Sequence, residues 1–164
     1  MNRLENIRVG LDIDDCLADF WGAYIKRFGN PKSDFEITRN VERVLKNDKD
    51  FWLTLPKLRD LDFEPTLYCT KRVNNKAWTR KWLIENGFPD KPIYQVHYQR
   101  GNKANFIKGR VDLFIDDSFV NVVQCNNAGI LTLLADTEGN RKYDVPYRIN
   151  DISSNSICEF LNTL

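Results

Sequence analysis

The sequence lacks the features that mark a membrane protein, a secreted protein or a zinc protein. No apolar run approaches the roughly 20 residues that a membrane helix needs. The first six residues carry no apolar stretch and no small-residue cleavage pattern, so we expect no signal peptide. The four cysteines are scattered and form no C-x-x-C pair. We therefore expect a cytoplasmic protein in a reducing compartment, with no membrane partner.

An excess of charge of one sign is also missing. The chain has 24 Lys and Arg against 23 Asp and Glu, which gives a net charge of +1. Because nucleic-acid binding depends on a positive field, we do not expect nucleic acid as the main partner. No internal repeat or low-complexity tract is present, and 42% of the 164 residues are hydrophobic. These values predict one ordinary globular domain.

Apolar runs of strand length alternate along the chain with segments of helical period. The predicted strands are 7–13, 66–70, 92–97, 111–115 and 130–134. The predicted helices are 17–28, 75–85, 103–108, 119–127 and 152–161, with a short helix at 41–45. The polar stretch 30–40 is expected to be a loop, and no helix or strand is predicted in the long polar segment 136–150.

This alternation predicts an α/β fold with right-handed crossovers. We expect a Rossmann-like, doubly wound parallel sheet of about five strands. The segment between the first two strands is too long for a simple crossover and is interpreted as a small helical cap. Residues 1–164 then form a single domain, with a cap at 18–64 and an α/β core made of 1–17 and 65–164.

Polar side chains follow several of the predicted strands. They are Asp12 and Asp14 after the first strand, Thr70 and Lys71 at the second, Lys103 at the start of a helix, and Asp116 and Asp117 after the fourth. Because the carboxyl ends of parallel strands share one edge of the sheet, we expect these side chains to meet there.

Such a group suits phosphoryl transfer. A carboxylate that attacks a phosphate is repelled by it, and a divalent cation held by hard oxygen ligands screens that repulsion. We expect Mg²⁺ held by Asp12 and Asp116, with Lys103 and Thr70 on the phosphoryl oxygens. Asp12 is the candidate nucleophile, and Asp14 is the candidate acid and base at the leaving oxygen.

The stretches VGLDIDDCL, TLYCT and DLFIDDS, with Lys103 between the last two, resemble the four motifs of the haloacid dehalogenase superfamily in their order. DIDDCLADF, FWLTLPKL and TKRVNNKAWTRKWLIENGFP are similar to the 5′(3′)-deoxyribonucleotidase group and its phage and bacterial relatives. The resemblance covers nearly the whole chain.

This resemblance implies Asp12 as nucleophile and Asp14 as acid and base. It implies that Thr70 and Lys103 hold the phosphoryl group, and the adjacent Lys71 and Arg72 are further candidates for phosphate contact. It also implies Mg²⁺ bound by Asp12, by the backbone carbonyl of Asp14 and by Asp116. Asp117 is expected to orient Lys103 or a water on the metal.

Each of these residues also has a plainer interpretation. The acidic residues in the first and fourth segments are common capping residues of a following helix. Thr70 is equally consistent with a strand-end hydroxyl, while Lys71, Arg72 and Lys103 are consistent with solvated surface charge. Aromatic residues in the cap, such as Phe20 and Trp52, suit either base stacking or core packing.

The expected function is a magnesium-dependent phosphomonoesterase that acts on a small phosphorylated metabolite, foremost a 5′-nucleotide. Two alternatives remain: a 3′-phosphatase on nucleic-acid ends, and a non-enzymatic phospho-accepting module of the receiver type. The sequence indicates neither the exact substrate nor an oligomeric state.

Overall fold

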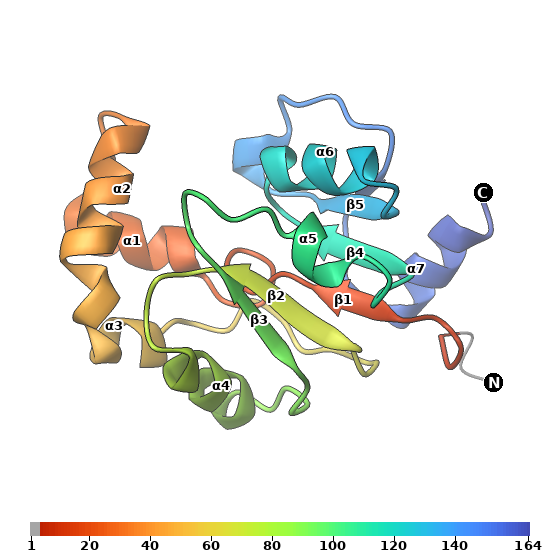
Figure 1. Ribbon diagram of the computed structural model, residues 1–164, viewed down its shortest axis with the longest axis horizontal. Helices are drawn as coiled ribbons and strands as arrows, with labels where there is room; N and C mark the ends of the chain where they lie inside the picture. The colour runs from red at the N-terminus through yellow and green to blue at the C-terminus, as the bar shows by residue number, and fades with distance from the viewer. Residues whose placement is uncertain (1–3) are drawn as a thin grey trace.

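The computed structural model describes residues 4–164, and at its centre lies a sheet of six parallel strands. The strands are β1 (Val9–Leu11), β2 (Leu67–Lys71), β3 (Ile93–Val96), β4 (Leu113–Asp116), β5 (Thr132–Ala135) and β6 (Arg148–Ile149). Their order across the sheet is β3-β2-β1-β4-β5-β6 (Figure 1). The predicted α/β fold with a parallel sheet is confirmed.

Seven α-helices surround this sheet within the described residues. They are α1 (Phe20–Phe28), α2 (Asp34–Arg43), α3 (Lys49–Leu53), α4 (Lys76–Glu85), α5 (Ala104–Ile107), α6 (Phe119–Asn127) and α7 (Ser154–Leu161). Two 3₁₀ turns accompany them, η1 (Leu45–Asn47) and η2 (Glu138–Asn140).

Both faces of the sheet are covered, because successive residues of a strand point to opposite sides. Ile115 of β4 belongs to one apolar cluster, with Trp82 of α4 and Ile157 of α7. Its neighbour Phe114 belongs to a second cluster. That cluster also contains residues of α5 and α6, namely Ala104, Ile107 and Cys125. Two cores on two faces are what a doubly wound sheet requires.

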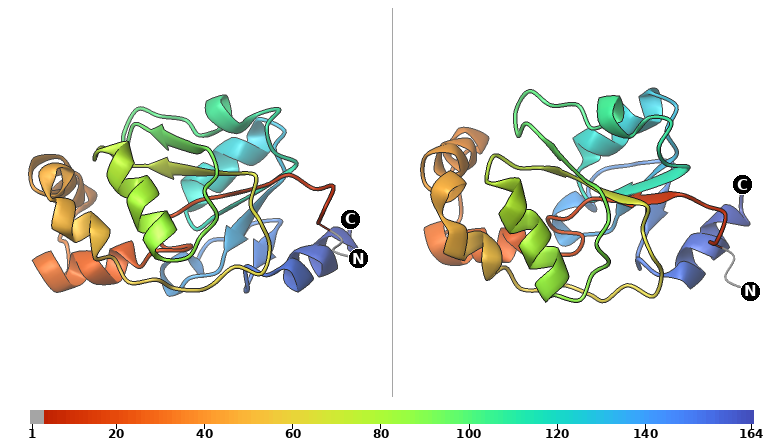
Figure 2. Two further views of the ribbon diagram at one scale, coloured as in Figure 1. Left: turned by 90° about the horizontal axis from the view of Figure 1, so that it is seen from below. Right: turned by 60° about the horizontal axis from the view of Figure 1, so that its bottom comes forward.

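The helices α1, α2 and α3 all lie between β1 and β2, where the cap was expected. Figure 2 shows them gathered at one end of the molecule, with α7 at the other. Their aromatic residues pack on one another: the Phe20 and Trp52 rings stack with centroids 5.8 Å apart, and Phe51 meets both rings edge-on. Trp52 and Phe51 are buried. These rings therefore form the core of the cap and are not available to stack on a base.

The prediction that 30–40 lies outside regular structure is wrong, because α2 begins at Asp34. Ser33 accepts a hydrogen bond from the Glu36 amide at 3.2 Å, and the Glu36 carboxylate accepts one from the Lys32 amide at 2.9 Å. These two bonds satisfy backbone donors at the helix start. Val41, on the same helix, is buried in the core. The short helix predicted at 41–45 therefore overlaps only the end of α2, because the polar residues before Val41 gave no clear apolar period.

No helix or strand is predicted in the stretch 136–150, yet it contains β6. This strand has only two residues and pairs with β5. Arg148 anchors the segment by donating to Asp136 and to Asn140, both at 2.9 Å. So short a strand leaves no periodic apolar signal, which is why five strands were expected and six are present.

No helix among residues 4–164 combines the length and the apolar character needed to cross a membrane.

Candidate active site

All seven site residues predicted from the sequence line one cavity of about 420 Å³ at the carboxyl edge of the sheet. They come from the loop after β1, from β2, from the residue before α5, and from β4 and the residue that follows it. Thr38 of α2 also lines this cavity, so the cap contributes to its wall. Chain segments far apart in sequence thus converge as the parallel sheet predicted.

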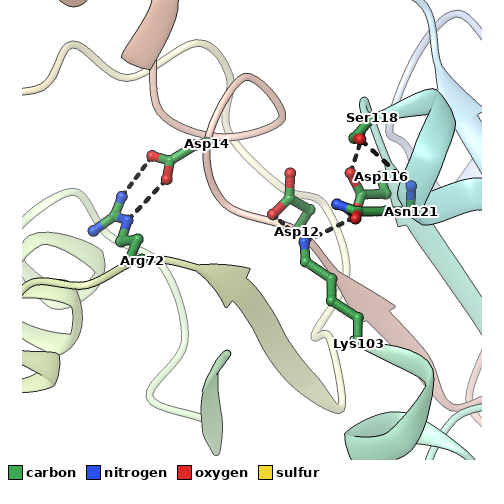
Figure 3. Close-up of polar contacts among 7 residues, drawn as sticks. All are labelled: Asp12, Asp14, Arg72, Lys103, Asp116, Ser118 and Asn121. Carbon is green, nitrogen blue, oxygen red and sulfur yellow. Dashed lines mark hydrogen bonds and ion pairs between the residues drawn. The ribbon is translucent and has the colours of Figure 1, made fainter. Parts of the chain in front are cut away.

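Lys103 lies at the base of this cavity between two carboxylates. Its Nζ donates to Asp12 Oδ1 and to Asp116 Oδ2, both at 2.7 Å (Figure 3). The Lys103 side chain is 1% exposed, so the interpretation as a solvated surface lysine is wrong. Burial acts to lower the pKa of Lys103, but the charges of Asp116 and Asp12 outweigh it and hold that pKa well above its usual value. Lys103 is therefore a permanent cation.

The Asp116 carboxylate accepts three hydrogen bonds from the protein. Its Oδ1 accepts from the Ser118 amide at 2.9 Å, and its Oδ2 accepts from Asn121 Nδ2 at 3.1 Å as well as from Lys103. Asp116 itself is completely buried. These contacts make it suited to hold Lys103 in place, and they leave about one of its four acceptor positions for a metal ion. The Ser118 side chain, and neither neighbouring acid, provides the N-terminal cap of α6.

Asp117 instead approaches Asp12. Ligand atoms of Asp12, Asp117 and Cys16 all lie within 4.8 Å of one another. Two carboxylates at this separation suit a hard dication such as Mg²⁺. The thiol of Cys16 does not, because thiolates prefer softer metals and burial raises the pKa of this thiol well above its usual value. The donor set thus fits magnesium through its two carboxylates.

Burial and mutual repulsion change the acidity of these carboxyl groups. Burial, together with the charge of Asp116, raises the pKa of Asp12 to about 7, although Lys103 opposes the shift. Burial, followed by the charges of Asp12 and Asp116, raises the pKa of Asp117 well above its usual value. Burial likewise raises the pKa of Asp15 to about 7. A cluster with this much unbalanced negative charge favours the binding of a cation.

Thr70 and Lys71 complete the cavity from β2. The Thr70 hydroxyl is fully buried and has no hydrogen-bond partner within residues 4–164. A buried polar group without a partner costs free energy, so this hydroxyl is available to form a hydrogen bond with a ligand atom. Burial, and then the charge of Lys103, lowers the pKa of Lys71. Both side chains are placed where they can contact an anion in the cavity.

Asp14 does not cap α1, whose N-terminal capping residue is Asp19. Its side chain points away from Asp12 and toward Arg72 (Figure 3). Asp14 Oδ2 accepts from Arg72 Nε at 2.9 Å, and Asp14 Oδ1 accepts from the Arg72 terminal nitrogen at 2.7 Å. Sequence reasoning left Arg72 open between phosphate contact and surface charge, and both interpretations differ from the buried position observed.

A larger hollow of about 1170 Å³, here called the side hollow, adjoins the cavity and shares four lining residues with it: Asp15, Asp117, Ser118 and Val120. Trp21 of α1, 44% exposed, lies on its wall. The stacked rings of Phe119 and Tyr143, with centroids 4.3 Å apart, lie there too. The Phe119–Tyr143 pair was not singled out from the sequence, because it joins two segments that only the fold brings together.

No model of a known protein family matches this chain, and no curated protein matches it either.

Substitutions of Asp117 and of Asp116 should have different effects, because Asp117 is a candidate magnesium ligand and Asp116 holds Lys103 in place. We expect 10 mM MgCl₂ to raise the melting temperature of the wild type, as a ligand at about 100 times its Kd stabilises by about 2.7 kcal/mol. Asp117→Asn should abolish this rise, while relieving repulsion in the metal-free protein. Asp116→Asn should destabilise the protein by about 3 kcal/mol, because Lys103 loses a buried partner. A full magnesium response in Asp117→Asn would contradict the assignment.

The raised pKa values of the buried carboxyl groups predict a pH dependence of stability. The folded pKa of Asp12, about 7, exceeds its unfolded value, so the folded state binds this proton more tightly than the unfolded state does. The stabilising contribution is therefore present at low pH and is lost as pH rises from about 4 to 7. Urea unfolding of metal-free protein should show that the stability of Asp12→Asn relative to wild type is more favourable at pH 7.5 than at pH 5. The same stability difference between variant and wild type at both pH values would argue against a raised pKa.

Proposed function

We propose that this protein is a magnesium-dependent phosphomonoesterase of the haloacid dehalogenase type, acting on a small phosphorylated metabolite such as a 5′-nucleotide. The observation that carries the proposal is the Lys103 ammonium at 2.7 Å from both Asp12 and Asp116, beside the unpartnered hydroxyl of Thr70. A nucleophile, an anion-binding cation and a buried donor thus face one cavity. The motif order in the sequence supports the same function.

In this proposal Asp12 attacks the phosphorus atom through a carboxylate oxygen. The bond from phosphorus to the leaving oxygen breaks, and Asp14 gives its proton to that oxygen. Water then attacks the aspartyl-phosphate, returns a proton to Asp14, and releases inorganic phosphate and free Asp12. Lys103, Lys71 and Thr70 hold the phosphoryl oxygens throughout. Asp116 acts on none of the reacting atoms, but it keeps Lys103 in position.

Asp12 and Asp117, with the backbone carbonyl of Asp14, would hold Mg²⁺. This assignment exchanges the sequence-based roles of Asp116 and Asp117, and it rests on the three hydrogen bonds that Asp116 already accepts. When bound, the ion neutralises the negative charge that opposes attack of a carboxylate on a phosphate.

The charge of the side hollow favours a small substrate over a nucleic-acid end. Asp15, Asp19 and Glu138 line the hollow, with Lys142 as the only Lys or Arg among its lining residues. An uncharged aromatic base can lie against Phe119 and Tyr143, whereas a chain of further phosphates would meet carboxylates. The 3′-phosphatase alternative is thus less favoured, and the cap argues in the same way against a receiver-like module. We also retain a cytoplasmic location as part of the proposal.

Replacement of the nucleophile tests the reaction directly. Wild-type protein with magnesium should hydrolyse p-nitrophenyl phosphate, and Asp12→Asn should lower kcat by about 10³-fold or more, because no aspartyl-phosphate can form. Acid quenching during turnover should trap phosphate on the wild-type protein and none on the variant. Turnover by the variant at the wild-type rate would remove Asp12 from the mechanism.

Removal of the aromatic wall tests the substrate class. Loss of stacking is worth about 1–3 kcal/mol, so Tyr143→Ala should raise KM for the preferred 5′-nucleotide about tenfold. Turnover of glycerol phosphate, which has no base, should not change. Phe35→Ala is the matched control, since Phe35 is an exposed aromatic residue in the cap, away from both cavities. Faster turnover of a 3′-phosphorylated oligonucleotide than of any mononucleotide would favour the nucleic-acid alternative.

A further inference from the structure

Arg72 is buried at a junction between the core and the cap. Its side chain is 0% exposed, and its backbone amide continues the pairing of β2 with β3 by donating to Val96 at 3.2 Å. The guanidinium contacts three different segments: Asp14 after β1, Thr79 of α4 at 3.2 Å, and the ring of Trp52 in α3, whose centroid lies 4.7 Å away. Such a cation needs its partner, since an uncompensated buried charge is strongly destabilising.

Contacts with Thr79 and Trp52 fix the plane of the Arg72 guanidinium independently of Asp14. Thr79 Oγ1, which accepts from Arg72, donates in turn to Gln95 Oε1 of β3 at 2.9 Å. Trp52 is also held, because its indole nitrogen donates to the Leu45 carbonyl at 2.7 Å. A planar fork with fixed donors orients a carboxylate in two dimensions, which a single ammonium cannot do. Arg72 therefore sets the orientation of the Asp14 carboxyl group.

Asp14 is the exposed member of this pair. Its side chain is 18% exposed and lines the same cavity as Asp12 and Thr70, whereas Arg72 does not reach the cavity. A carboxylate offers about four acceptor positions, and Arg72 occupies one on each oxygen. One remaining position can carry the proton that passes to the leaving oxygen, and the other can accept a hydrogen bond from a water molecule, while the pair with Arg72 stays intact.

We propose that Arg72 is a positioning residue for Asp14, and that through Trp52 it links the orientation of Asp14 to the packing of the cap. This inference rests on the proposed function, in which Asp14 transfers the proton. Arg72 touches neither the phosphoryl group nor the leaving group. Its effect on the reaction passes through Asp14, and a displaced cap would move Trp52, Arg72 and Asp14 together.

Two substrates that differ in their leaving group can distinguish an effect of Arg72 on the orientation of Asp14 from a general structural effect. Phenyl phosphate and p-nitrophenyl phosphate have nearly the same shape, but phenolate is the poorer leaving group and depends more on a proton donor. With magnesium-loaded protein, we expect Arg72→Lys to lower kcat for phenyl phosphate at least tenfold more than kcat for p-nitrophenyl phosphate. KM should change little for either substrate. Asp14→Asn should show the same pattern with a larger amplitude.

Two comparisons test whether Arg72 acts through Asp14. In the Asp14→Asn background, Arg72→Lys should cost less than twofold further in kcat for phenyl phosphate, because there is no proton donor left to orient. Arg80→Lys is the matched control, since Arg80 forms the same type of two-bond pair with Asp90 on the exposed surface of α4. This control should leave both kcat values unchanged.

Milder variants keep the test decisive if Arg72→Lys fails to fold. Thr79→Val removes one hydrogen bond to Arg72, and Trp52→Phe reduces the ring beneath the guanidinium; both should give the same leaving-group pattern with smaller losses. Equal losses on both phosphates in all of these variants, or additive losses in the double variant, would overturn the inference. If the wild type hydrolyses neither phosphate, the proposed function fails first, and that outcome is distinct from a wild type that is active with uniformly impaired variants.

Discussion

The site depends on one buried ammonium group held between two buried carboxylates. Lys103 compensates Asp12 and Asp116, which come from neighbouring parallel strands, and this compensation makes it tolerable to bury charge at the carboxyl edge of β1 and β4. One cation cannot balance every acid in the cavity, however. Asp117 and Asp15 add further carboxyl groups, and burial first, then the charges of neighbouring acids, raises their pKa values. A cavity that is short of positive charge is suited to gain it from a dication.

The two buried cations of the site have different geometries and therefore different tasks. Lys103 is a compact charge on a long stem, and it can bridge two carboxylates that come from different strands. Arg72 is a planar fork that orients a single carboxyl group and stacks on an aromatic ring of the cap. The first arrangement fixes the base of the cavity, and the second fixes its wall toward the cap.

The aromatic residues near the site form two groups, one packed inside the cap and one on the wall of the side hollow. Phe20, Phe51 and Trp52 pack on one another and give a cap of three short helices its own core. Trp21, Phe119 and Tyr143 instead have accessible rings on the wall of the side hollow. A hollow with aromatic walls and an acidic rim is compatible with an uncharged ring system and unfavourable to a polyanion.

The sequence by itself determined the alternation of strands and helices, the place of the cap and the convergence of seven polar residues, because these follow from apolar periodicity and from the common direction of parallel strands. It placed only the end of α2, in the helix predicted at 41–45, and it missed β6, which has only two residues. Only the tertiary structure decided which partner each member of a polar pair meets. Asp116 meets Lys103 and Asp117 meets Asp12, whereas Arg72 lies in the core and Lys71 on the cavity wall. Adjacent strand residues such as Lys71 and Arg72 point to opposite sides, and the partners of all four lie far away in the chain, so packing of the sheet, helices and cap against one another makes the choice.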